Sequence, residues 1–224
     1  MNLTGKKYTK PSLLLVFDLD QTLICANSSY QFFHYLRGRK VFSASSLITT
    51  LIYAFRLKTA HISLLEFHHQ IFDTFLKGIS LPLLESEAEQ FVSEFLPKAL
   101  NWSALSCLNW ARQMGWSTAI LSNSPDFLVR PIAEKLRVTY WDATHYEVDK
   151  DRRLCQIANL MMGEEKARKL DKMRVQLGIE KEQVVAYSDS IHDLPMLLAA
   201  GTAVGVNPDK KLLEHCLSHD WRVI

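Results

Sequence analysis

The stretch SLLLVFDLDQT, residues 12–22, decides the fold because an apolar run ends abruptly in acidic residues. Residues 13–17 are all apolar, so side chains on both faces of a strand here would be apolar, and a run of this length is typical of a buried strand in a parallel sheet. Asp18, Asp20 and Thr22 follow that run at once. Polar side chains in this position lie at the carboxyl edge of a parallel sheet, which is where such folds bind their ligands.

Three later segments repeat the pattern of an apolar strand followed by polar residues. Residues 117–121 (STAIL) run into SNSP, residues 183–187 (QVVAY) into SDS, and residues 202–206 (TAVGV) into NPD. Helical patterns follow these segments. The alternation predicts the α/β fold class, with a doubly wound parallel sheet. Residues 145–157 contain a short polar turn between two β-like runs, which indicates a hairpin.

The region from residue 27 to residue 98 lacks this alternation. Aromatic and aliphatic side chains such as Phe32, Tyr35 and Leu36 recur there at helical spacing. We therefore expect residues 27–98 to form a small all-helical domain inserted into an α/β core of residues 1–26 and 99–224. The apolar stretch 47–55 suggests either packing inside the insertion, which is favoured, or contact with a membrane surface.

Composition narrows the classes of function. The 224 residues are 48% hydrophobic and 22% charged, as in ordinary globular proteins. The 26 basic and 24 acidic side chains give a net charge of +2, which predicts no nucleic-acid partner. Apolar runs are too short to span a bilayer. The four cysteines form no CxxC pair, and no apolar leader is visible, so we expect a cytoplasmic protein.

The polar residues that follow the strands indicate one site. The set comprises Asp18, Asp20, Thr22, Ser122, Asn123, Asp189 and Asp193, together with Lys166 at the start of a later helix. Two carboxylates about 4 Å apart repel by about 4 kcal/mol at an effective dielectric constant of about 20. Such a cluster takes up protons or holds a cation, and Mg²⁺ prefers oxygen ligands of this kind. Unrelated helix-capping aspartates are the alternative, which two pairs on two strands disfavour.

Four segments together carry a family resemblance. In order, FDLDQT (residues 17–22), ILSNSP (120–125), GEEKARKL (163–170) and AYSDSIHDLPML (186–197) resemble the four motifs of the haloacid dehalogenase superfamily. The insertion between the first two motifs is similar to the helical C1 cap of subfamily IB, which includes phosphoserine-phosphatase-like and histidinol-phosphatase-like enzymes. The resemblance implies a Mg²⁺-dependent hydrolase that acts on a small phosphomonoester.

The resemblance also implies a role for each matching residue. Asp18 would be the nucleophile that forms an aspartyl-phosphate. Asp20 would protonate the leaving alcohol and later activate water. The implied substrate- and phosphate-binding residues are Thr22, Ser122, Asn123 and Lys166. Thr22 would also help to fix Asp20. The implied metal ligands are Asp18, Asp20, Asp189 and Asp193, the last as a ligand or as an anchor behind the others.

Some positions depart from the family pattern. Gln21 and Ser188 stand where glycine is common, and His192 stands where asparagine is common. Asn27 stands where phosphoserine phosphatases carry a glutamate for the substrate ammonium, and it also suits a helix N-cap. Three alternatives stay open: phosphotransfer through the same intermediate, a peripheral lipid-phosphate phosphatase, and a non-catalytic binding protein of the same fold. The sequence leaves the substrate and the oligomeric state open.

Overall fold

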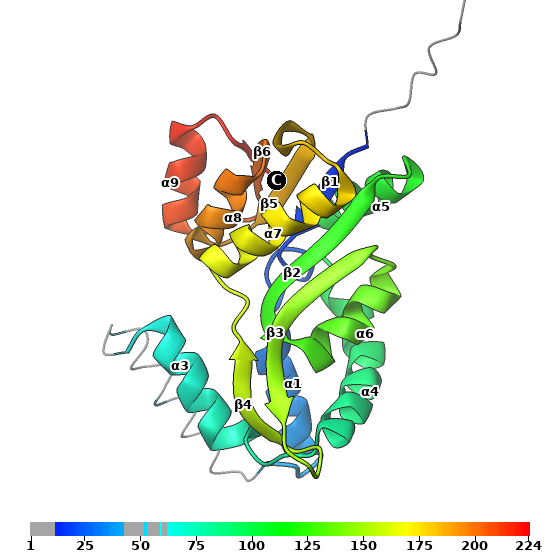
Figure 1. Ribbon diagram of the computed structural model, residues 1–224, viewed down its shortest axis with the longest axis vertical. Coiled ribbons are helices and arrows are strands. Elements are labelled where there is room, and N and C mark those ends of the chain that lie inside the picture. The colour runs from blue at the N-terminus through cyan, green and yellow to red at the C-terminus, as the bar shows by residue number, and fades with distance from the viewer. Residues whose placement is uncertain (1–11, 43–51, 53–58, 60–61) are drawn as a thin grey trace, which may run out of the picture. The chain divides into compact units, whose positions relative to one another are not determined.

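The computed structural model describes residues 12–42, 52, 59 and 62–224. The apolar stretch 47–55 therefore lies, except for Ile52, outside the described residues. A seven-stranded sheet has the order β4-β3-β2-β1-β5-β6-β7, and Figure 1 labels β1 to β6. The chain adds strands outward from β1 on one side, then returns to β5 on the other. This is the doubly wound arrangement that the sequence predicts.

The strands follow the expected apolar runs. Their bounds are β1 Leu14–Phe17, β2 Ser117–Pro125, β3 Tyr140–Val148, β4 Leu154–Asn159, β5 Val184–Ser188, β6 Thr202–Gly205 and β7 Arg222–Val223. Strand β1 pairs in parallel with β2 and β5, and β3 pairs with β4 as the expected antiparallel hairpin. Every residue of β1 is buried, as expected of a strand covered on both faces. Strand β2 is longer than predicted because its polar SNSP end stays extended.

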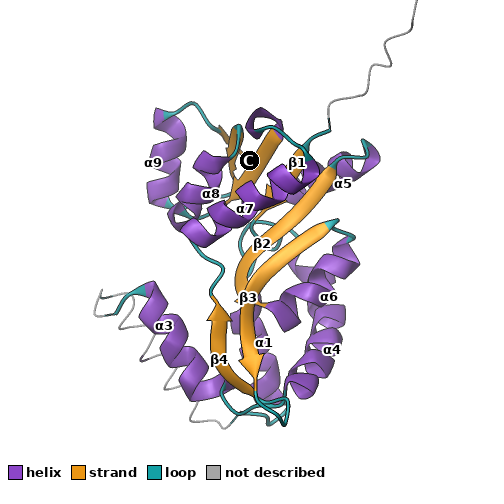
Figure 2. Cartoon of the chain, in the orientation of Figure 1, coloured by secondary structure: helices purple, strands orange, loops and turns teal. Residues whose placement is uncertain are grey.

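Helices connect and flank the strands (Figure 2). Their bounds are α1 Ser28–Gly38, α3 Leu64–Ile71, α4 Leu81–Ala99, α5 Trp102–Gln113, α6 Asp126–Leu136, α7 Glu164–Leu177, α8 Leu194–Ala199 and α9 Lys210–Ser218. Short turns are the π-helical η1 (Phe72–Leu76) and the 3₁₀-helical η2 (Lys181–Gln183) and η3 (Ile191–Asp193). None of the helices in the described part of the chain combines the length and apolar character needed to cross a bilayer.

The chain divides into two compact units. The first comprises Met1–Leu23, Asn101–Ile120 and Met162–Ile224, and the second comprises Ile24–Leu100 and Leu121–Met161. The second unit thus combines α1, α3 and α4, which belong to the expected insertion, with α6, β3 and β4. The named elements within residues 27–98 are all helical. The sequence-based boundary, with residues 27–98 alone as the cap, stays a prediction.

Aromatic packing explains why α6 groups with the inserted helices. The Phe32 ring of α1 lies 5.3 Å from the Phe91 ring of α4 and 6.3 Å from the Phe127 ring of α6, between centroids. All three side chains are buried. Aromatic pairs at such distances stabilise packing beyond the area that they bury. These contacts join residues that are 59 and 95 positions apart in the chain.

Candidate active site

The carboxyl ends of β1 and β5 bring two of the expected acidic motifs to one edge of the sheet. Phe17 pairs with Tyr187 in the parallel register, and the two rings stack at 4.4 Å between centroids. The amide of Asp18 donates a 2.9 Å hydrogen bond to the carbonyl of Tyr187. Asp18 and Asp189 therefore leave neighbouring strands at the same edge, as the sequence pattern predicts.

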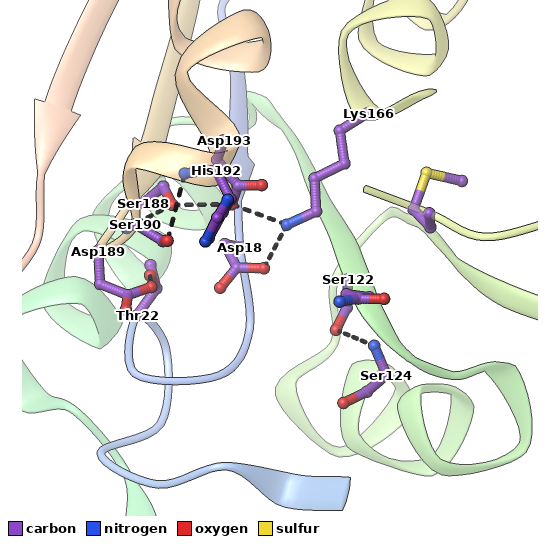
Figure 3. Close-up of polar contacts among 12 residues, drawn as sticks. Asp18, Thr22, Ser122, Ser124, Lys166, Ser188, Asp189, Ser190, His192 and Asp193 are labelled. Atoms are coloured by element: carbon purple, nitrogen blue, oxygen red, sulfur yellow. Dashed lines mark hydrogen bonds and ion pairs between the residues drawn. The ribbon is translucent and has the colours of Figure 1, made fainter. Parts of the chain in front are cut away.

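The Lys166 ammonium joins two carboxylates of the first unit (Figure 3). Its Nζ donates to Asp18 Oδ1 at 2.6 Å and to Asp193 Oδ2 at 2.8 Å. The Ser188 hydroxyl donates to the same Asp193 oxygen at 2.8 Å. Lys166, Asp18 and Asp193 are 2%, 7% and 5% exposed. Because solvent barely reaches these charges, removal of one partner would leave a buried charge uncompensated.

Burial and mutual repulsion shift the ionisation of this group. Burial raises the pKa of Asp18 well above its ordinary value, and the charges of Asp193 and Asp189 add to the rise although Lys166 opposes it. Burial also raises the pKa of Asp189, to about 6. Burial alone would lower the pKa of Lys166, but the charges of Asp18 and Asp193 outweigh it, so the pKa is raised and the ammonium stays protonated. In this group, three carboxyl side chains, those of Asp18, Asp189 and Asp193, face one ammonium group, that of Lys166.

Two further side chains fix the loop that carries Asp189. Thr22 Oγ1 donates to Asp189 Oδ1 at 3.1 Å, and the amide of Asp209 donates to the Asp189 carbonyl at 2.7 Å. The Asp209 carboxylate accepts from the amides of Ile191 and Leu212, each at 2.9 Å. These bonds outweigh its burial and lower the pKa of Asp209. Asp209 is not among the site residues expected from the sequence, although the NPD turn after β6 indicates a polar residue at this edge.

Ser122 and Asn123 lie near the end of β2, in the second unit. Ser122 Oγ accepts a 3.1 Å hydrogen bond from the Ser124 amide (Figure 3). The Asn123 carbonyl accepts from Thr144 Oγ1 at 2.8 Å, and its side-chain Nδ2 lies 2.9 Å from His68 Nε2. Ser122 is buried, at 1% exposed. The role of Ser122 and Asn123 in binding phosphate with Lys166 stays a prediction.

The departures from the family pattern have local explanations. Gln21 adopts a positive φ of 60°, a conformation that glycine reaches without strain, which accounts for the glycine common at that position. Asn27 caps α1, since its side-chain oxygen accepts a 2.8 Å hydrogen bond from the Tyr30 amide. The capping prediction for Asn27 is confirmed. His192 is exposed.

The expected metal ligands are not arranged as a closed cluster. Among the described residues, no three histidine, cysteine, aspartate or glutamate side chains form a group that could hold a metal ion. Lys166 Nζ instead lies between Asp18 and Asp193. The donor chemistry still fits Mg²⁺, because the ligands offered are oxygen atoms. The raised pKa values of Asp18 and Asp189 also indicate uncompensated negative charge that a cation would relieve.

Comparison with known proteins identifies the family. Residues 15–198 match the family model described as haloacid dehalogenase-like hydrolase, and the chain belongs to this family. Over 210 residues it is 26% identical to a probable phosphatase of Mycobacterium tuberculosis, and the alignment covers 93% of this chain and 73% of that protein. Over 216 residues it is 25% identical to a phosphoserine phosphatase of the same organism, and this alignment covers 92% of this chain and 68% of that protein. Family and relatives classify the chain as an enzyme of the phosphatase type.

A solved structure supports the fold over the whole chain. The crystal structure of a protein of unknown function from Bordetella pertussis matches with a TM-score of 0.84 and 24% identity. The match covers 96% of this chain and 98% of that one. The α/β architecture with its inserted helices is therefore shared along essentially the full length of both chains.

Proposed function

We propose that this enzyme hydrolyses a small phosphomonoester in the presence of Mg²⁺, through a phosphoryl group held covalently on Asp18. The observation that carries the proposal is the buried Lys166 ammonium, 2.6 Å from Asp18 Oδ1 and 2.8 Å from Asp193 Oδ2. A fixed cation beside the attacking carboxylate stabilises the charge on phosphoryl oxygens during transfer.

Asp18 acts as the nucleophile in this proposal. One carboxylate oxygen attacks phosphorus, and the bond between phosphorus and the leaving oxygen breaks. The bond from Lys166 orients the carboxylate and favours its ionised form, because an opposite charge at this distance stabilises the anion. Asp193 accepts from Lys166 on the other side, and the Ser188 hydroxyl donates to the same Asp193 oxygen. We therefore assign Asp193 to anchoring Lys166.

Asp20 serves as the acid and then the base. It lies in the turn after β1, two residues beyond Asp18, and is partly exposed. In the first step it donates a proton to the leaving alcohol. In the second step it takes a proton from the water that attacks the phosphoryl group on Asp18. Each proton transfer typically contributes about 10²–10⁴-fold to the rate.

The carboxylates of Asp18 and Asp189, with the backbone carbonyl of Asp20, would hold Mg²⁺. When bound, the ion supplies positive charge that shields the nucleophile and the phosphoryl oxygens from each other. Thr22 and Asp209 hold the Asp189 loop in place through the bonds described above. Ser122 and Asn123 are proposed to bind phosphoryl oxygens together with Lys166.

Free phosphate release from a panel of metabolite phosphates, measured with Mg²⁺ and with excess chelator, tests the proposal. We expect turnover with Mg²⁺ and none with chelator. Asp18→Asn should be inactive, while Asp171→Asn, an exposed position on α7, should match the unsubstituted enzyme. An added alcohol acceptor separates hydrolysis from phosphotransfer by the ratio of free to transferred phosphate. Full turnover in chelator, or activity in Asp18→Asn, would refute the mechanism.

A further inference from the structure

His145 on β3 bridges two carboxylates of the second unit. Its Nδ1 lies 2.8 Å from Asp126 Oδ2, and its Nε2 lies 2.6 Å from Asp142 Oδ1. A neutral imidazole has one N–H donor and one lone pair, so it can donate to only one of these carboxylates. At the other contact, a nitrogen lone pair would face a carboxylate lone pair at hydrogen-bond distance. Both contacts are satisfied only when the ring carries two protons.

The surroundings favour this charged ring. Burial disfavours the charge, but the hydrogen bonds and charges of Asp126 and Asp142 outweigh burial, and the pKa of His145 lies above its ordinary value. The residue opposite His145 on β4 is Asn159, which does not titrate. Burial and the Asp126 charge raise the pKa of the adjacent Tyr146, so its phenol stays neutral. His145 is therefore the group here that changes charge closest to neutral pH.

Asp126 connects this cluster to the residues proposed to bind phosphate. It is the first residue of α6 and lies four residues after Ser122, and we call residues 122–126 the Ser122 segment. Thr144, next to His145 on β3, donates to the Asn123 carbonyl and accepts a 3.2 Å bond from the Met161 amide. The same strand thus holds the Ser122 segment at two points.

Contacts from other elements hold the middle of the Ser122 segment. The Ser124 hydroxyl lies 3.1 Å from that of Ser28 and 2.7 Å from that of Ser29 at the start of α1. Burial lowers the pKa of His68 to about 4, so its ring is neutral and its Nε2 accepts from the Asn123 amide. The contact at Asp126 is the one of these that depends on a histidine protonated near neutral pH.

We propose that protonated His145 is a positioning residue, which holds the Ser122 segment through Asp126 and so makes phosphate binding weaken when the ring loses its proton. The inference rests on the proposed role of Ser122 in phosphate binding. Deprotonation leaves one N–H for two carboxylates, so a lone pair faces a carboxylate at one of the two contacts, and the positive charge that attracts both Asp126 and Asp142 is lost. The attachment of the start of α6 to β3 through Asp126 is then weaker. Because the reacting carboxylates lie in the first unit, the effect appears in KM and hardly in kcat.

The test compares His145→Gln and His145→Arg with the unsubstituted enzyme between about pH 6 and pH 9. The substrate is p-nitrophenyl phosphate at saturating Mg²⁺, and NMR follows the His145 ring in parallel. We expect the KM of the unsubstituted enzyme to rise roughly tenfold through the pH midpoint of the ring. His145→Gln should keep the high KM throughout, and His145→Arg should keep the low KM throughout because its charge does not titrate.

The control is His69→Gln, at an exposed position on α3, which should reproduce the pH profile of the unsubstituted enzyme. Equal KM profiles for the His145→Gln and His145→Arg variants would overturn the inference. An enzyme inactive on every phosphomonoester would refute the proposed function instead. The NMR experiment then decides. The chemical shifts of the Ser122–Ser124 amides should change with pH at the same midpoint as the His145 ring, and they should not show this change in His145→Arg. Amide chemical shifts that do not change as the His145 ring titrates would overturn the inference.

Discussion

The Thr22 hydroxyl donates a 3.1 Å hydrogen bond to Asp189 Oδ1 and so joins the turn after β1 to the loop after β5. Thr22 is fully buried. Burial raises the pKa of Asp189, and the bond from Thr22 is the largest influence acting in the opposite direction. A residue that family resemblance places beside Asp20 thus also controls the charge of a proposed metal ligand.

Thr22→Val should weaken Mg²⁺ activation. Without the hydroxyl, the pKa of Asp189 rises further, so less of the ionised form is present to bind the metal near neutral pH. A lost hydrogen bond to a charged group corresponds to roughly a tenfold higher Mg²⁺ concentration for half-maximal activity. Mg²⁺ titrations of the phosphatase reaction measure this. Thr22→Ser keeps the hydroxyl and should stay near the unsubstituted enzyme; an unchanged Mg²⁺ requirement in Thr22→Val would contradict the assignment.

The metal-free protein should lose stability as the pH rises from about 4 to about 6. Asp189 ionises near pH 4 in the unfolded chain, but its pKa is about 6 in the folded chain. Between these values the folded chain binds more protons, so the free energy of unfolding falls with rising pH. The contribution of Asp189 is on the order of 2 kcal/mol. Denaturant titrations in chelator measure it, and Asp189→Asn should lack this part of the slope. Identical slopes would rule out the shift.

The acidic edge was predictable because its signal is local. Each strand is a short apolar run that ends in polar residues, so the position of Asp18 after β1 and of Asp189 after β5 follows from the sequence alone. The parallel register of Phe17 with Tyr187 then places both at one edge. The helix containing Lys166 was also expected, with Gly178 ending it in a left-handed conformation at a φ of 63°.

The contacts between distant segments could not be predicted. The sequence groups Lys166 with Asp18 in one site, but it does not predict the direct bond between these two residues, which lie 148 positions apart. His145, Asp126 and Asp142 likewise come from α6 and β3, with no periodic pattern among them. The association of α6 with the inserted helices depends on aromatic rings such as Phe32 that pack across the unit. Only tertiary packing determines these neighbours.

Asn27→Ala should destabilise the fold without removing a charged group. The Asn27 side chain satisfies the Tyr30 amide at the first turn of α1, and loss of such a cap costs about 1 kcal/mol. Chemical denaturation measures the change. Asn27→Asp keeps an accepting oxygen and should retain the stability of the unsubstituted chain. Equal stability of the alanine variant would mean that water replaces the cap fully.

Phosphoserine should be no better a substrate than other phosphomonoesters. Asn27 occupies the position where the family's phosphoserine enzymes carry a charged glutamate, and its oxygen is already engaged with the Tyr30 amide. An uncharged, engaged side chain offers little to a substrate ammonium. Values of kcat/KM across a panel of phosphate esters measure the preference. A phosphoserine value far above all others would show that another side chain supplies the charge.

Substitutions of Asp18 and Asp20 should separate the two chemical steps. Asp18→Asn removes the attacking carboxylate, so neither turnover nor a phosphorylated protein should be detected. Asp20→Asn keeps the nucleophile and its bond to Lys166 but removes the acid and the base, each worth about 10²–10⁴-fold. With p-nitrophenyl phosphate, the leaving group needs little protonation. Phosphorylation should therefore survive better than hydrolysis of the phosphorylated protein.

The Asp20→Asn protein should accumulate one phosphoryl group, because the step that forms the acyl-phosphate slows less than the step that consumes it. Mass spectrometry after rapid quenching measures the added group, and hydroxylamine should remove it, as expected of a phosphoryl group on a carboxylate. Asp171→Asn serves as the matched control and should show no accumulation. A phosphoryl group on Asp18→Asn, or its complete absence from Asp20→Asn under turnover, would favour direct attack by water over a covalent step on Asp18.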